Sequence, residues 1–247
     1  MAIAITEDHQ ALGATVADLA DKRQLLEANR SLLEASEENL PAAWDEIAKL
    51  GWLGLHVPEA YGGSGFGLEE LVVVVEELAR KVAPGPFVPT VIASAAISAS
   101  GDEAACTNLL PGLADGSRTA AVALGALGAT ATLSGSTISG SAGVVLGGGL
   151  ASVLLVAFGD DVAVVDLSDP GVTVETPVNL DPSRRSARIT LDDTPATVLA
   201  GGAQAMLDMS RLILSADAVG IAAECTRAAA EYAKERIQFG RPIAMFQ

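Results

Sequence analysis

One long helical pattern near the end of the sequence sets the main constraint on the fold. From about Ala203 to Arg236 the pattern is helical and rich in Ala, Leu, Ile and Met, and it ends with Gly240 and Pro242. At about 1.5 Å per residue, such a helix is about 50 Å long. A helix of that length cannot bury its own apolar surface. Either the rest of a helical bundle or another subunit must therefore cover it.

Shorter helical patterns precede this segment. Thr6 can cap a first helix, with Glu7 and Asp8 favouring its positive end, and Pro41 suits the first turn of a second helix. A run of valines at 72–75 would alone favour a strand, but the flanking Glu, Leu and Ala residues extend it to helical length. We expect helices over residues 6–29, 41–50, 68–82, 88–98 and 103–114.

The pattern changes after Gly116 to short apolar runs broken by Gly, Ser, Thr and Asp, which is typical of a small antiparallel sheet. We expect strands over residues 119–124, 144–146, 153–158, 162–165, 172–175 and 187–191. The sequence therefore predicts an α+β chain of several domains. Their expected bounds are 1–117 for an N-terminal helical domain, 118–200 for a middle β-domain and 201–247 for the start of a C-terminal helical domain.

The charge balance narrows the classes of partner. With 31 acidic and 15 basic residues, the formal net charge is -16, which repels nucleic acid and anionic membranes. A nucleotide cofactor is still compatible, because local N–H groups and a few cations can outweigh a distant charge. Cys106 and Cys225 are far apart in helical segments, so we expect reduced thiols and no metal site. We expect a soluble, cytoplasmic protein.

Two segments carry residue patterns that suit a binding site. Residues 50–80 place four glycines between two helices, which allows a tight reversal and a close approach to a ligand, although a purely structural turn explains the pattern as well. Residues 231–247 place Arg236, Phe239 and Gln247 at a helix end. A guanidinium can pair with a pyrophosphate, an aromatic ring can flank a cofactor ring and an amide can bond its edge. The alternative is a solvated basic helix end.

Both segments resemble the acyl-CoA dehydrogenase family. The first contains GLHVPEAYGGSG, similar to the family pattern G-L-x-x-P-E-x-Y-G-G-x-G, and the second contains RIQFGRPIAMFQ, similar to R-x-Q-F-G-x-P-I-x-x-x-Q. The stretch NLLPGLADG at residues 108–116 also resembles the family's entry into its β-domain. In order and length the resemblance covers the whole chain: a helical domain, a β-domain and the first helix of a four-helix bundle that is here truncated.

The resemblance implies FAD as cofactor and an acyl-CoA as substrate. Residues matching Arg236, Phe239 and Gln247 contact FAD in the family, typically a cofactor held mainly by a neighbouring subunit, so a homo- or hetero-oligomer is implied. An electron-accepting flavoprotein or another acceptor is implied as well. In the family a carboxylate removes the α-proton and flavin takes the β-hydrogen as hydride. That carboxylate lies beyond the motif ending at Gln247, so no catalytic residue is assigned.

The middle domain departs from the family pattern. Where the family carries a T-E-P-x-x-G-S-D-like run, this chain has residues 123–128, ALGALG, and where it carries G-x-K-x-W/F-I-T, this chain has residues 140–146, GSAGVVL. Valine and leucine side chains cannot hydrogen-bond the polar edge of a flavin. We therefore expect this β-domain to bind FAD weakly.

Two functions follow as expectations. In the first, the intact assembly is an acyl-CoA dehydrogenase that forms trans-2-enoyl-CoA, although this chain alone is inactive. In the second, the chain is a non-catalytic, dehydrogenase-like half or subunit of a fused or heteromeric enzyme, as in steroid side-chain breakdown, and contributes to a neighbour's FAD site. A flavin monooxygenase on the same scaffold is a third reading that no residue here favours.

Overall fold

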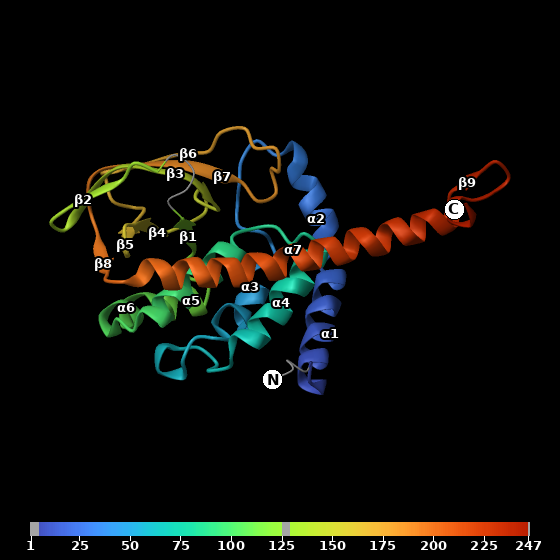
Figure 1. The fold of residues 1–247 in the computed structure, drawn as a ribbon, viewed down its shortest axis with the longest axis horizontal. Helices are drawn as coiled ribbons and strands as arrows, with labels where there is room; N and C mark the ends of the chain where they lie inside the picture. Colours follow the sequence, from blue (N-terminus) through green and yellow to red (C-terminus); the bar gives the residue numbers. More distant parts are fainter. Residues whose placement is uncertain (1–4, 125–128, 247) are drawn as a thin grey trace.

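A computed structural model describes residues 5–124 and 129–246. A layer of helices and a curled sheet lie on opposite sides of one long helix, α7 (Gly202–Glu235), which runs between them and then extends past both (Figure 1). The architecture confirms the expected order of a helical domain, a β-domain and a C-terminal helix.

The helical layer is built from apolar faces that share one core. Its elements are α1 (Glu7–Lys22), α2 (Leu25–Ser31), η1 (Leu32–Glu34), α3 (Trp44–Lys49), η2 (Trp52–Gly54), η3 (Glu59–Tyr61), α4 (Leu68–Arg80), α5 (Phe87–Ser100) and α6 (Glu103–Ala114). Helix α5 is buried along most of its length, which explains why its sequence is apolar on every face. The valine run is part of α4, so the helical interpretation of that segment is confirmed.

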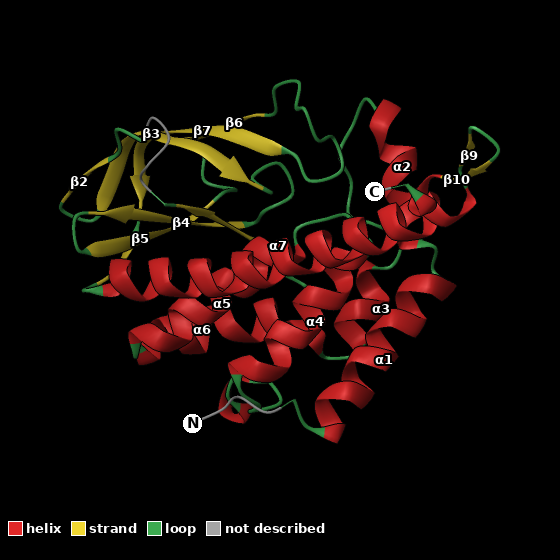
Figure 2. Cartoon of the chain, turned by 45° about the vertical axis from the view of Figure 1, so that its right-hand side comes forward, coloured by secondary structure: helices red, strands yellow, loops and turns green. Residues whose placement is uncertain are grey.

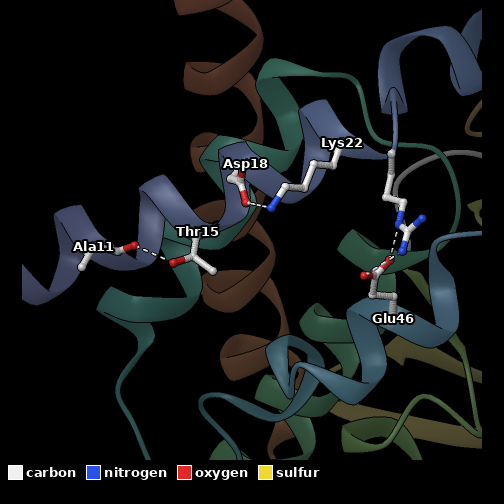
Figure 3. Close-up of polar contacts among 6 residues, drawn as sticks. Ala11, Thr15, Asp18, Lys22 and Glu46 are labelled. Atoms are coloured by element: carbon white, nitrogen blue, oxygen red, sulfur yellow. Dashed lines mark hydrogen bonds and ion pairs between the residues drawn. The ribbon is translucent and has the colours of Figure 1, made fainter.

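The first expected helix, 6–29, is wrong in one respect, because it is two helices. Gln24 adopts a left-handed conformation with φ of 49° between α1 and α2. Arg23 turns away at this point and binds Glu46 of α3 through Nε and Nη2 at 2.5 and 3.1 Å, while Lys22 stays with Asp18 at the end of α1 (Figure 3). The break then turns Leu25 into the core, so packing outweighs the local helical pattern.

The middle domain is a sheet of eight strands in the described part of the chain. They are β1 (Ala120–Ala123), β2 (Thr132–Ser134), β3 (Thr137–Leu146), β4 (Val153–Phe158), β5 (Asp161–Asp166), β6 (Val172–Glu175), β7 (Ser186–Pro195) and β8 (Thr197–Leu199). The order is β6-β7-β3-β1-β4-β5-β8, and β2 pairs with β3. The pairs are antiparallel as expected, except that β1 and β4 run parallel. The sequence patterns missed β2 and β8, and they predicted only residues 144–146 of the longer strand β3.

The sheet curls so that it has an inside and an outside (Figure 2). Alternate residues along each strand point to opposite faces. In β1 and β4, Ala121 and Leu154 join a core enclosed by the sheet. Their neighbours Ala120 and Leu155 join the larger core shared with the helices. The side chains on the second face of these strands therefore pack against the helices and join the β-domain to the helical layer.

Only the first half of α7 is covered. Its buried residues include Met206, Ser210, Ile213, Asp217 and Gly220, and this buried stripe lies against α4 and α5. A Cβ on Gly220 would lie 2.2 Å from the Glu76 carbonyl oxygen, so the two helices cross there in backbone contact. No later residue of α7 is buried, which agrees with the expectation that such a helix needs a further partner. Within the described residues, no helix combines the length and apolar character needed to cross a bilayer.

Candidate functional site

A small folded tip follows the exposed end of α7. Strands β9 (Ile237–Gln238) and β10 (Arg241–Pro242) form a hairpin, and η4 (Ile243–Met245) folds back from it toward the helix. The amide of Ile243 donates to the Arg236 carbonyl oxygen at 2.8 Å and closes the base of the hairpin. In Figure 1 this tip is the part of the molecule that lies farthest from the helical layer and the sheet.

The hairpin turn forces an aromatic residue into an uncommon conformation. Phe239 and Gly240 have φ values of 50° and 80°, as a two-residue turn with two left-handed positions requires. Glycine tolerates this conformation, but a bulky aromatic residue does so at a cost. Phe239 is nevertheless 95% exposed. A strained residue that presents an apolar ring to solvent points to recognition of a ligand or partner.

Arg236 differs from the other cations of the long helix. Arg211, Arg227 and Lys234 each pair with an acidic residue three positions earlier, namely Asp208, Glu224 and Glu231. Arg236 lies just past the helix end, is exposed, and has an alanine three positions earlier. Its guanidinium makes no ion pair with any carboxylate of the described residues.

The tip also differs in charge from the rest of the protein. Residues 236–247 contain Arg236 and Arg241 and no acidic residue, in a chain whose net charge is -16. Guanidinium groups bind phosphate oxygens through two parallel N–H bonds, and an aromatic ring beside them can flank a planar group. The residues present therefore fit a ligand that combines a pyrophosphate with a flat ring system, as FAD does.

The structure brings together two of the three site residues expected from sequence. Arg236 and Phe239 lie on the same hairpin, whereas Gln247 lies outside the described residues. Sequence reasoning missed Arg241 and Phe246. The Arg241 guanidinium lies 4.1 Å from the centre of the Phe246 ring. The alternation of Arg and Phe over residues 236–246 could have suggested this stacking.

The glycine-rich segment between η3 and α4 is a packed turn. The amides of Ser64 and Gly65 donate to the carbonyl oxygens of Gly54 and Val57, each at 2.9 Å. A Cβ on Gly63 would lie 2.0 Å from the Val57 carbonyl oxygen. The glycines are thus used for close backbone packing, which favours the structural explanation of this pattern. Among the described residues, no group of three His, Cys, Asp or Glu side chains could hold a metal ion.

The β-domain positions that depart from the family pattern offer few side-chain donors. Residues 125–128 lie outside the described residues, and residues 140–146 belong to β3. Val145 points into the sheet core and Val144 points outward. The hydroxyl oxygen of Ser141 already accepts a bond from the Gly143 amide at 3.0 Å. A cofactor on this face would find mainly backbone groups and apolar side chains.

Among the described residues, Asp217 is the only acidic residue that is buried, with 9% of its surface exposed. Arg184, from the connection between β6 and β7, donates to its two oxygens at 2.8 and 2.9 Å and to the Ala83 carbonyl oxygen at 3.1 Å. A general base needs a free lone pair within reach of the proton that it removes. The carboxylate of Asp217 keeps further lone pairs, but it is buried and held in an ion pair with Arg184, so Asp217 is a structural anchor and no candidate for that role.

A cavity of about 420 Å³ opens where the sheet meets the start of α7. Its lining includes Leu124, Ala157, Asp160, Gln204 and Met206. The described lining residues include no cation, and the Asp160 carboxylate would repel a phosphate. The cavity therefore suits an apolar or amide group better than a pyrophosphate.

Two protein-family descriptions match the chain. The N-terminal domain of acyl-CoA dehydrogenases matches residues 6–117, and the C-terminal domain of acyl-CoA dehydrogenases matches residues 201–247. Together with the helical domain, the β-domain and the long helix, these matches show that the chain belongs to the acyl-CoA dehydrogenase family.

Several individual members of the family are similar to this chain. Acyl-CoA dehydrogenase FadE34 of Mycobacterium tuberculosis is 36% identical over 89% of this chain and 30% of its own length. A variant of the steroid ACAD Tcur3481-Tcur3483 is 35% identical, with a TM-score of 0.88 over 99% of this chain and 71% of that one. A chain of the ChsE4-ChsE5 complex of M. tuberculosis is 27% identical, with a TM-score of 0.88 over 100% of this chain and 72% of that one.

A glutaryl-CoA dehydrogenase of Mycobacterium smegmatis, solved in complex with FADH2, shares the fold at 22% identity and a TM-score of 0.81, over 98% of this chain and 69% of that one. The chain spans less than a third of the FadE34 length and about 70% of these solved chains.

Proposed function

We propose that this chain is a dehydrogenase-like subunit or half that supplies its C-terminal hairpin to an FAD site held mainly by a neighbouring subunit. The assembly so formed dehydrogenates an acyl-CoA thioester. The observation that carries the proposal is the tip itself: Arg236 has no carboxylate partner among the described residues, and Phe239 is strained and 95% exposed. Both residues stand at the end of a helix that extends past the rest of the chain (Figure 1).

The roles of the chain's own residues follow from this geometry. Arg236 donates charge-assisted hydrogen bonds to a pyrophosphate oxygen, and Phe239 packs beside a flat ring while excluding water from it. Gln247 matches the last position of the family motif, and on that ground we propose that it bonds a polar cofactor edge. When bound in the assembly, FAD supplies the acceptor for the hydride that leaves the substrate.

A neighbour's site is favoured over a site on this chain's own β-domain. The hairpin extends away from that domain, and the β3 residues at positions 140–146 offer mainly apolar side chains. A flavin bound there would leave polar edges without side-chain partners.

We propose a steroid side-chain acyl-CoA as the first substrate class to test. A similar solved protein is a steroid ACAD, and another is the two-component ChsE4-ChsE5 complex. The assembled enzyme should turn over a steroid-CoA thioester faster than a straight-chain acyl-CoA of similar size. A preference for the straight chain would exclude the steroid part of the proposal and leave the FAD role intact.

The FAD role is tested by substituting Arg236 in the assembled enzyme. A charge-assisted bond to a partly buried phosphate is worth roughly 1.5–3 kcal/mol, against about 1 kcal/mol for a neutral bond from Gln247. We therefore expect Arg236→Ala to weaken FAD binding by about ten-fold or more, and Gln247→Ala to weaken it less. Flavin absorbance that co-elutes with the protein on gel filtration measures the effect.

Arg227→Ala is the matched control, because Arg227 lies on the same exposed helix but pairs with Glu224. It should retain flavin as the unaltered protein does. Equal flavin retention in the Arg236, Gln247 and Arg227 variants would reject the cofactor role of the hairpin.

A further inference from the structure

Three side chains at the tip form one stacked cluster. The Arg241 guanidinium lies over the Phe246 ring at 4.1 Å from its centre. The Phe239 ring meets the same Phe246 ring edge-on, with 6.2 Å between the ring centres and 77° between the planes. Phe246 is therefore the central member, with a cation on its face and a second aromatic ring beside it.

The backbone that carries Arg236 also holds this cluster. Ile243 donates to the Arg236 carbonyl oxygen at 2.8 Å, and the Phe246 amide donates to the Ile243 carbonyl oxygen at 3.1 Å. These two bonds bring Phe246 back beneath the hairpin. Arg241 also pairs with Gln238 across the hairpin, next to the strained Phe239. A change in the stacking of Arg241 on Phe246 would therefore alter the conformation of Phe239.

We propose that Arg241 is a positioning residue, which acts by stacking on Phe246 and thereby holds Phe239 in its left-handed, outward conformation. The inference rests on the proposed FAD role of the hairpin and identifies which further residue prepares the tip for binding. A planar guanidinium stacks on an aromatic face and keeps its N–H edges free, whereas a lysine ammonium carries the same charge as a compact, strongly hydrated group. The role assigned to Arg241 thus depends on its shape as well as its charge.

The test compares Arg241→Lys, which keeps the charge, with Arg241→Met, which removes it, in the assembled enzyme. Positioning by stacking predicts that both variants release FAD faster, by about two- to five-fold, with similar rates. The melting temperature should stay unchanged, because Arg241, Phe239 and Phe246 are all exposed. Arg227→Lys is the matched control on α7 and should release FAD at the unaltered rate.

A second readout does not use the flavin. In the 247-residue chain, nuclear Overhauser contacts between the Phe239 and Phe246 rings should be present, and both Arg241 variants should weaken them. A role in general stability would instead lower the melting temperature without loss of these specific contacts.

Several outcomes would overturn the inference. If Arg241→Lys behaves as the unaltered protein and only Arg241→Met releases FAD faster, charge alone matters and stacking does not. Unchanged release in both variants, while Arg236→Ala still loses FAD, rejects the positioning role and leaves the proposed function standing. If Arg236→Ala also retains FAD, the proposed function fails and the inference fails with it.

Discussion

His56 shows how one partly buried residue makes the stability of the fold depend on pH. Its Nε2 lies 3.0 Å from the Ser94 hydroxyl, which itself donates to the Val91 carbonyl oxygen. Nε2 therefore carries the proton and donates to Ser94, while the buried Nδ1 finds no partner among the described groups. Burial lowers the pKa of His56 to about 4. The folded protein thus keeps this imidazole neutral.

The first prediction at the residue scale concerns acidification. Because the pKa of His56 in the folded state lies below the unfolded value of about 6.5, protons bind the unfolded chain more readily. The contribution of neutral His56 to the free energy of unfolding is fully present above pH 6.5 and falls as the pH drops toward 4. Below pH 4 the free energy of unfolding is lower by about 3 kcal/mol. Urea unfolding of the 247-residue chain at pH 7 and pH 4.5 should show a smaller loss for His56→Gln than for the unaltered protein.

Ser94→Ala serves as the control for this prediction. It removes the hydrogen-bond partner but leaves the ring buried, and burial is the cause of the low pKa of His56. This variant should keep the pH dependence of the unaltered chain. If His56→Gln lost as much stability between pH 7 and pH 4.5 as the unaltered chain does, His56 would not be the group that causes the pH dependence.

At the scale of elements, the ten residues between β6 and β7 join the three parts of the molecule. Arg184 binds Asp217 of α7 and the carbonyl oxygen of Ala83, between α4 and α5. The next residue, Arg185, donates to the carbonyl oxygens of Ala35 and Ser36, beyond η1. Two successive arginines thus connect the β-domain to the helical layer and to the long helix.

Breaking the Arg184–Asp217 pair should destabilise the chain strongly. Both side chains are only 13% exposed. Removing one partner of a buried pair leaves an uncompensated charge and costs about 3–5 kcal/mol, whereas replacing both by apolar residues costs much less. We expect Arg184→Met to lower the free energy of unfolding by about that amount, and the double variant with Asp217→Leu to recover a large part of it. Urea unfolding of the three proteins measures the difference.

Lys22→Met is the matched control, because Lys22 pairs with Asp18 in an exposed i,i+4 arrangement on α1. Exposed pairs of this kind contribute little to stability. A loss in Arg184→Met no larger than in Lys22→Met would show that the buried pair does not hold α7 in place.

At the scale of the whole molecule, we expect catalysis to need the assembled enzyme. Asp217 is bound by Arg184, and the exposed hairpin reaches away from the chain's own sheet. We predict that the purified chain with FAD and an artificial electron acceptor does not dehydrogenate acyl-CoA. The assembled enzyme is the positive control in the same assay. Measurable turnover by the chain alone would refute the prediction.

Much of the fold was determined by local sequence signals. The segments at 103–114, 153–158 and 172–175 begin and end where the sequence predicts, because apolar spacing and capping act over a few residues. The specific motif at residues 236–247 likewise identified the family and located Arg236 and Phe239 on one structural unit. These properties depend on neighbours along the chain.

Other features were decided by contacts between segments far apart in sequence. The break at Gln24 accompanies the burial of Leu25 in the core, β1 pairs in parallel with β4 across the strands that intervene in sequence, and the buried Asp217 pairs with Arg184. The stacking of Arg241 on Phe246 arises in the same way, from the fold of the tip. Such contacts form only when packing brings the segments together, because the free energy of burial outweighs local propensity. The sequence by itself therefore determined most of the elements and the family motif, and the tertiary structure decided how the elements are joined and which side chains remain exposed.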